Sequence, residues 1–325
     1  MPRIMKRAAG LALATLALAD VAIAQSVPTI RFGRQTAAED NVWLMIAKPD
    51  LTPNLNKSYK IEWNQFRASD VAFKAYQGGQ IDMLTTACNS VITAASKEVE
   101  IKVVASASRE TQAGARTQYL SKKDGGPGSI ADLKGKIVGI VGHRTATELW
   151  ARMALKSGGL DPDKDVQWAV VPFASVGDAV RADRIAVGAV PDLFAPTQLA
   201  KGDLKILFSS KTGMPFDEEL ICVSANPAFI AKNAAAVRGF LADLTTATTY
   251  LTTNRDAARK ALLEAKLVQL PPDIYLSSPE YVRDPNLRID LGNFAKQQDA
   301  LVSAGFIDKK IDLAKLVDLS LLPAQ

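Results

Sequence analysis

Two short segments of the chain carry small polar side chains where a strand is expected to pass into a helix. Residues 85–90 read TTACNS, and residues 142–148 read GHRTATE. In parallel sheets such junctions lie at the carboxyl ends of the strands, where helix N-termini present unpaired amides and partial positive charge. Both segments are therefore candidate binding loops for a small anion. As single residues, Asn89 and Thr145 could act only as helix caps, and Thr145 has capping-box spacing to Glu148.

The side chains that common catalytic centres need are scarce. His143 is the only histidine, the two cysteines are far apart, and no close cluster of carboxylates accompanies them, which argues against a metal site. The chain contains no G-x-S-x-G elbow, no G-x-G-x-x-G loop and no Walker motif. We therefore expect a protein that is not an enzyme, with no catalytic residues, no cofactor and no metal.

The first 24 residues have the features of a cleaved signal peptide. Arg3, Lys6 and Arg7 precede an apolar run, and AIA at residues 22–24 offers the small-x-small pattern that signal peptidase cuts. The run is about a dozen residues long, shorter than the ~20 that span a bilayer. We expect residues 1–24 to be removed, leaving a periplasmic chain that begins at Gln25. No cysteine lies at the cleavage point to carry a lipid anchor.

The length and the charge of the chain limit the class of protein to which it can belong. After removal of the leader, residues 25–325 suffice for two domains with their own cores. The formal net charge of +5 comes from Lys and Arg residues scattered along the chain, and aromatic residues make up only 6%. This composition gives no support to nucleic-acid binding, and no later apolar stretch is long enough to span a membrane.

Beyond the leader, short apolar strands alternate with helical patterns, which is typical of an α/β protein with mainly parallel sheets. In a first unit, strands are expected at residues 28–33, 59–66, 80–86 and 100–106, and helices at 40–47, 69–76 and 89–96. In a second unit, strands are expected at 115–121, 137–141, 166–172, 185–190 and 204–208, and helices at 146–157 and 176–182. There follow a return strand at 219–224 and an amphipathic helix with Val237, Phe240, Leu241 and Leu244 on one face.

This order of elements predicts two lobes joined by two crossings, with a hinge at the crossings and a cleft between the lobes. Residues 25–112 and 227–325 would form the first lobe, and residues 113–226 the second. Cys88 would then lie in a cleft loop and Cys222 on a hinge-side strand. We therefore predict two unbonded, half-buried thiols in different lobes.

Three segments resemble one protein family. SIADLKGKIVGI at residues 129–140 is similar to its DLKGKKVGV strand motif, GGQID at residues 78–82 is similar to its G-x-I-D turn, and NPAFIAKN at residues 226–233 fits as well. The family is that of the periplasmic solute-binding proteins of ABC transporters for taurine, aliphatic sulfonates, nitrate and related solutes, which also includes binders of pyrimidine precursors. The similarity covers nearly the whole chain after the leader.

The resemblance implies a two-lobe α/β fold, the type II periplasmic-binding-protein fold, which closes on a solute in the cleft. By position it places the ligand loops at Gln35, Thr36, Phe66, Arg67, Thr86, Cys88, Asn89, Ser108, Arg109, His143, Arg144, Thr145, Ala146, Pro191 and Asp192. It also implies a monomer whose partners are an ABC permease and its ATPase. The chain departs from the family at residues 143–144, where small residues are usual, and at residues 183–187, where DRIAV replaces G-x-V-D-A.

We expect the chain to capture a small organic anion, such as a sulfonate, a carboxylate or a nitrate-like ion. Arg144, at a helix start, is the better candidate for the counter-charge, whereas Arg109 could touch the solute or brace the hinge. Two alternatives stay open. One is an enzyme or binder for a pyrimidine-type thiamine precursor on the same fold, and the other is a sensory subunit that presents its closed form to a membrane receptor.

Overall fold

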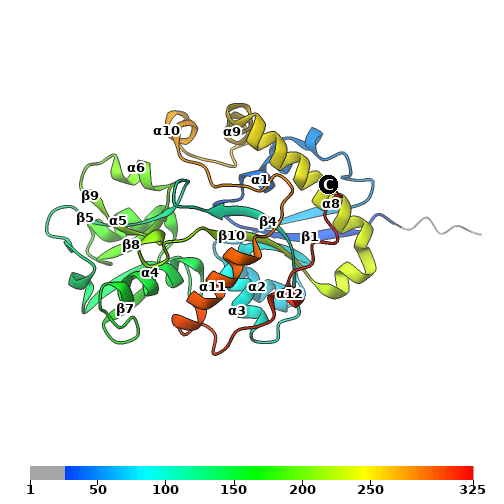
Figure 1. Cartoon of the computed structure of the whole chain (residues 1–325). Coiled ribbons are helices and arrows are strands. Elements are labelled where there is room, and N and C mark those ends of the chain that lie inside the picture. The colour runs from blue at the N-terminus through cyan, green and yellow to red at the C-terminus, as the bar shows by residue number, and fades with distance from the viewer. Residues whose placement is uncertain (1–25, 325) are drawn as a thin grey trace, which may run out of the picture.

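The polypeptide forms two lobes, each built around a five-stranded sheet (Figure 1). The computed structural model describes residues 26–324, so the expected signal peptide at residues 1–24 lies outside the described range. In Figure 1 the first lobe lies at the right and the second at the left. The expected α/β fold with two lobes is confirmed.

The first sheet contains the strands β1 Thr29–Arg34, β2 Lys60–Gln65, β3 Met83–Ala87, β4 Lys102–Glu110 and β10 Glu218–Ala225. Their order across the sheet is β2-β1-β3-β10-β4. Strand β1 is parallel to β2 and β3, whereas β10 is antiparallel to both of its neighbours. Every residue of β3 and β10 is buried, because both strands lie inside the sheet and are covered on both faces.

The second sheet contains the strands β5 Thr117–Lys122, β6 Lys136–Ile140, β7 Val166–Val170, β8 Val187–Pro191 and β9 Leu204–Ser209. Their order is β7-β6-β8-β5-β9, with β6 parallel to β7 and β8. Strand β5 is antiparallel to β8 and β9. The first strand after each crossing is β5 in the second sheet and β10 in the first sheet. Each of these strands lies between two neighbours and runs antiparallel to both.

Helices cover both sheets. The first lobe carries α1 Asp40–Ala47, α2 Ser69–Gln77, α3 Cys88–Ala95, α8 Pro227–Thr253, α9 Arg255–Glu264, α10 Pro272–Ser277, α11 Leu291–Ser303 and α12 Leu313–Leu316. The second carries α4 Ala146–Ser157, α5 Val176–Arg181 and α6 Ala195–Leu199, and α7 Ser210–Gly213 lies between β9 and β10. Short 3-10 turns occur at Pro49–Leu51, Ala131–Leu133 and Phe173–Ser175. Along α8, the apolar face expected from the spacing of Val237, Phe240, Leu241 and Leu244 is fully buried, which confirms that prediction.

Two crossings connect the lobes, from β4 to β5 and from β9 through α7 to β10, and in Figure 1 β4 and β10 run side by side through the middle of the molecule. A buried ionic cluster occupies this place. The Nζ of Lys211 lies 2.6 Å from Oε1 of Glu218, which also accepts a hydrogen bond from Nε1 of Trp150 at 2.8 Å. Glu110 pairs with Glu218 in the sheet register, and burial raises the pKa of its carboxyl to about 7.

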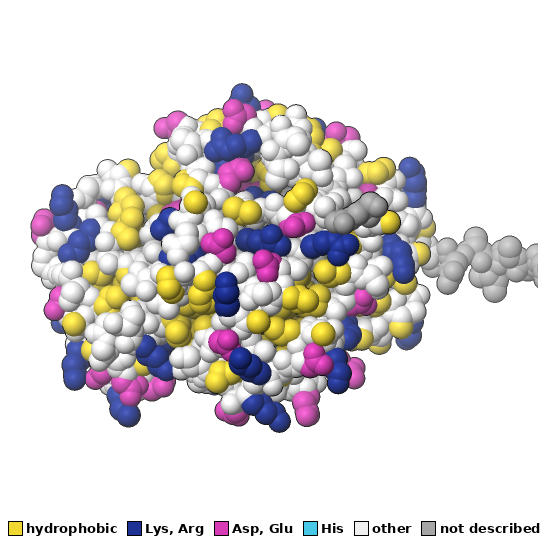
Figure 2. Space-filling model, viewed as in Figure 1, with side chains coloured by type: hydrophobic (Ala, Val, Ile, Leu, Met, Phe, Trp, Pro, Cys, Tyr) yellow, Lys and Arg dark blue, Asp and Glu magenta, His cyan; other side chains and the backbone are white. Residues whose placement is uncertain are grey.

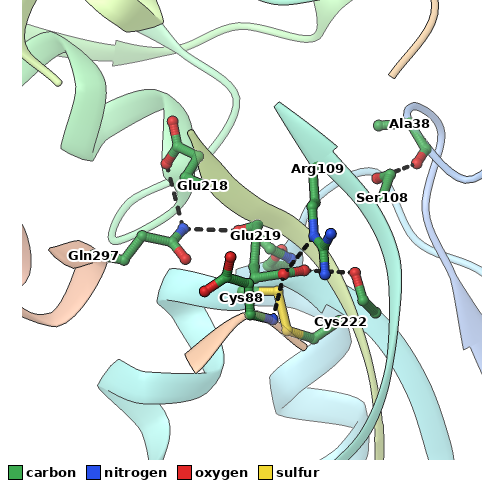
Figure 3. The surroundings of a disulfide bond; sticks show 12 residues. Ala38, Cys88, Ser108, Arg109, Glu218, Glu219, Cys222 and Gln297 are labelled. Carbon is green, nitrogen blue, oxygen red and sulfur yellow. Dashed lines mark hydrogen bonds and ion pairs between the residues drawn. A yellow bond between two sulfur atoms is a disulfide. The ribbon is translucent and has the colours of Figure 1, made fainter. Parts of the chain in front are cut away.

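Cys88 and Cys222 form a disulfide, with their Cα atoms 5.1 Å apart (Figure 3). The sequence-based prediction of two free thiols in different lobes is therefore wrong. The reason is the placement of β10, which enters the first sheet beside β3 and pairs Cys222 with Thr86, two residues before Cys88. Both cysteines are fully buried.

The surface carries mixed charge. On the face in Figure 2, Lys and Arg side chains are interspersed with Asp and Glu and form no continuous basic stripe. Within residues 26–324, no helix combines the length and the apolar character that crossing a membrane requires.

Candidate functional site

A cavity of about 70 Å³ lies between the lobes, at the carboxyl ends of their strands. The first lobe contributes Gln35, Thr36, Ala37, Ala38, Arg67, Ala68, Ser69, Ala87, Leu220, Ile221 and Tyr281, and the second contributes Thr117, Val141, Thr145, Ala146, Thr147, Trp150, Phe173 and Pro191. Loops after β1, β2 and β6 supply part of the wall, and Ala87 and Pro191 are the last residues of β3 and β8. This is where open α/β sheets bind ligands.

Helix N-termini from both lobes border the cavity. Ala68 and Ser69 open α2, and Thr145, Ala146 and Thr147 open α4. Neither helix has a side-chain cap, so the first-turn amides remain available to a ligand. Thr145 occupies the N-cap position, but its hydroxyl donates to the Gly142 carbonyl at 2.8 Å. The capping box suggested by its spacing to Glu148 is therefore not formed.

Arg67 supplies a charged side chain to the wall. Among the described residues that line the cavity it is the one with a formal charge. Its Nη1 donates to the Val141 carbonyl in the other lobe at 2.8 Å, and its Nη2 lies 3.7 Å from Oδ2 of Asp70. Because the Arg67 side chain spans the cleft, it can bind a solute anion and join the two lobes at the same time.

Six of the residues placed in the ligand loops by resemblance line this cavity, namely Gln35, Thr36, Arg67, Thr145, Ala146 and Pro191. The other nine do not line it, namely Phe66, Thr86, Cys88, Asn89, Ser108, Arg109, His143, Arg144 and Asp192. Most of these have other partners. Ser108 donates to the Ala38 carbonyl, and Asp192 accepts from the Arg116 amide at 2.8 Å. Thr86 and Asn89 are buried, each with one polar atom that has no partner among the described residues.

The two arginines considered for the counter-charge are bound elsewhere. Nη1 of Arg144 donates to the Phe306 carbonyl at 2.7 Å, and its guanidinium lies 5.5 Å from the centre of the Phe306 ring. Nε of Arg109 pairs with Oε1 of the buried Glu219 at 2.7 Å (Figure 3). Arg109 therefore links β4 to β10, the strands next to the two crossings, and does not line the cavity.

Sequence reasoning did not identify the apolar half of the wall. Trp150, Phe173 and Tyr281 come from three distant parts of the chain, and Leu220 and Ile221 come from the return strand β10. No local pattern distinguishes such residues from ordinary core residues, because they become neighbours only when the two lobes meet.

The buried carboxyl group of Glu39 holds the loop of residues 35–38 in place. Oε1 of Glu39 accepts from the Gln35 amide and from Nε1 of Trp43, both at 2.8 Å, and Thr85 donates to Oε2. Within this loop Ala38 has a φ of +66°, a left-handed conformation that is unfavourable for a residue with a side chain. Burial raises the pKa of Glu39 to about 8.

We predict that Glu39→Gln flattens the dependence of stability on pH. In the native state Glu39 keeps its proton up to about pH 8, whereas the unfolded chain loses it near pH 4.5. Native protein therefore binds more protons in this window, and its free energy of unfolding falls as the pH rises through it. The variant should lose about 2–4 kcal/mol less than the wild type between pH 5 and pH 8. Urea unfolding at both pH values measures this, and parallel pH profiles for the two proteins would contradict it.

Comparison with known proteins agrees with this architecture. The NMT1/THI5-like family model matches residues 61–258, more than half of the chain. The periplasmic aliphatic sulphonate binding protein SsuA from Escherichia coli is 21% identical, with a TM-score of 0.69, covering 89% of this chain and 92% of that one. The alkanesulfonate-binding protein SsuA from Xanthomonas axonopodis pv. citri, bound to MOPS, is 17% identical, with a TM-score of 0.70, covering 89% of this chain and 98% of that one.

The periplasmic nitrate-binding protein NrtA from Synechocystis PCC 6803 is 12% identical, with a TM-score of 0.69, covering 90% of this chain and 86% of that one. No curated protein sequence matches the chain significantly. At these identities the solved structures establish a shared fold. With its match over residues 61–258, the chain belongs to the NMT1/THI5-like family and has the two-lobe fold of the periplasmic solute-binding proteins of ABC importers.

Proposed function

We propose that this protein is the periplasmic solute-binding component of an ABC importer, and that it captures a small organic anion between its lobes. The observation that carries the proposal is the cavity itself, where uncapped helix N-termini of α2 and α4 and the guanidinium of Arg67 converge from both lobes. All three favour negative charge. The basic, apolar leader at residues 1–24 supports export, and the protein would act as a monomer that delivers its solute to a permease and its ATPase.

The cavity also limits the size and character of the bound group. A volume of about 70 Å³ holds a compact acidic head such as a sulfonate, a carboxylate or nitrate, but not a large molecule. Trp150, Phe173 and Tyr281 provide apolar surface beside the polar loops. A small acid with an apolar part therefore fits the wall better than a fully hydrated inorganic ion does.

The same aromatic residues favour a second candidate, a flat heterocycle of the pyrimidine type. Trp150, Phe173 and Tyr281 present ring surfaces on which a planar solute can pack. Such a solute would need hydrogen bonds more than a counter-charge, and Gln35, Thr117 and Thr145 could supply them.

The test is binding with and without Arg67. Native mass spectrometry of gently purified protein should reveal a copurified solute, and calorimetry with that solute, or with a panel of sulfonates, carboxylates and pyrimidines, should give an affinity. We predict that Arg67→Ala weakens anion binding by about ten to a hundredfold, because a hydrogen-bonded charge contact contributes about 1.5–3 kcal/mol.

Arg184→Ala is the matched control, since that side chain is exposed on the second lobe and does not line the cavity, and the affinity of the variant should stay within about twofold of wild type. Unchanged affinity in Arg67→Ala with an anionic solute would contradict the proposal. Tight binding of a neutral pyrimidine would favour the second candidate, and recovery of a chemically altered solute would favour an enzyme.

A further inference from the structure

A second, larger cavity of about 490 Å³ adjoins the first, and we call it the outer cavity. Thr36 lines both. Three further segments line both cavities. They contribute Gln65, Ala174 and Leu193 to the outer cavity. To the inner cavity they contribute Arg67, Phe173 and Pro191. The two cavities are therefore successive parts of one cleft between the lobes. Only the outer cavity has the volume usual for the binding site of a small organic molecule.

The charged side chains on the wall of the outer cavity are both basic. Arg34, the last residue of β1, lies on one side, and Lys266, in the loop after α9, is exposed on its rim. No acidic residue of the described range lines it. Trp43, Leu193 and Phe194 form apolar surface between these polar groups.

Arg34 has no partner in the described part of the chain. Its Nε is buried and donates to no oxygen of the described residues, and no ion pair within residues 26–324 involves its guanidinium. The nearest carboxylate that influences it, Glu39, is already engaged by the Gln35 amide, Trp43 and Thr85. Half-buried guanidinium groups are normally paired, because removing them from water without compensation is costly. Burial accordingly lowers the pKa of Arg34.

No carboxylate of residues 26–324 forms an ion pair with Arg34, so a negative group of a ligand in the outer cavity can pair with its guanidinium. We propose that the outer cavity binds a second acidic group of the solute through Arg34, so that the natural solute is a small dianion with an acid at each end of a short apolar linker. This rests on the proposed function, in which the first acid occupies the inner cavity near Arg67. The apolar surface of Trp43, Leu193 and Phe194 then packs against the linker.

The test compares each dianion with the monoanion that lacks its second acid. Suitable pairs are succinate and butanoate, glutarate and pentanoate, adipate and hexanoate, and 3-sulfopropanoate and propane-1-sulfonate, measured by calorimetry on the full mature protein. We expect at least one dianion to bind wild-type protein about tenfold or more tightly than its monoanion. In Arg34→Met this advantage should fall to within about twofold while monoanion affinity is kept, and Arg34→Lys should restore part of it.

Arg184→Met, at an exposed position of the second lobe outside both cavities, is the matched control and should keep the full dianion advantage. Without solute, Arg34→Met should melt no lower than wild type, because it removes an unpaired charge rather than a contact. A marked loss of melting temperature would overturn the inference by showing that Arg34 has a structural partner.

The remaining outcomes separate the two proposals. If monoanions bind but no dianion binds more tightly, or if Arg34→Met keeps the dianion advantage, the role of Arg34 is refuted while the proposed function stands. If no acid of either kind binds wild-type protein, the proposed function fails and this inference fails with it.

Discussion

Replacing both cysteines, Cys88→Ala with Cys222→Ala, is expected to lower the free energy of unfolding by about 3–5 kcal/mol. The disulfide closes a loop with a sequence separation of 134 residues, so it removes a large share of the conformational freedom of the unfolded chain. Because both residues are fully buried inside the first lobe, alanine leaves only small voids and the native fold should persist.

Urea unfolding of the oxidised wild type and of the double variant measures this difference. Wild-type protein unfolded in reductant should match the variant, since both lack the cross-link, and this serves as the control. Thiol titration of denatured, unreduced wild type should find no free thiol. Two free thiols, or equal stability of oxidised and reduced protein, would refute the prediction.

We expect a comparable loss, about 3–5 kcal/mol at pH 8, from Lys211→Met in the crossing between β9 and β10. The change removes the buried cation that lies 2.6 Å from Glu218 and leaves two buried carboxyls, Glu218 and Glu110, without a positive partner. The loss should shrink at pH 5. Carboxyls whose pKa is raised in the native state take up protons at low pH, which neutralises the unpaired charge.

Urea unfolding at pH 5 and pH 8 tests this expectation. Lys201→Met is the control, because it removes an exposed lysine near β9, and it should lower the free energy of unfolding by less than about 0.5 kcal/mol. The double variant Lys211→Met with Glu218→Gln should recover part of the loss at pH 8, because it removes one of the stranded charges. A loss that is equal at both pH values would mean that the packing of the Lys211 stem, and not its charge, stabilises the crossing.

Local patterns were enough to predict most of the fold. The helices at residues 40–47 and 146–157 have the expected bounds, and the alternation of strands and helices correctly indicated two α/β lobes. The position of β10 was beyond such patterns. Its sequence identifies a strand, but its place between β3 and β4 depends on contacts over more than a hundred residues of sequence. The prediction of two free cysteines was wrong because the place of β10 beside β3, which brings Cys222 to Cys88, could not be foreseen.

Several of the predicted loop residues line the cavity, whereas the two arginines considered for the counter-charge do not. Residues such as Gln35 and Thr145 reach the cavity because their backbone positions, directly after a strand or at a helix start, fix where they lie. Arginine is different, because its long flexible stem lets the guanidinium find a partner several ångströms from its Cα. Arg144 therefore reaches Phe306 in the other lobe, while Arg34 and Arg67 face the cleft.

The disulfide also constrains the order in which the molecule is completed during synthesis. The bond joins a residue before the second lobe to a residue after it, so the whole of that lobe lies inside one covalent ring. The first sheet cannot be completed until β10 has been synthesised. Every strand of the second lobe precedes β10 in the chain and has therefore already been synthesised by then. The N-terminal lobe is thus the last to be finished, in contrast to the usual sequence in which N-terminal domains fold first. Once the ring is closed, a protease cut within the second lobe leaves both fragments joined.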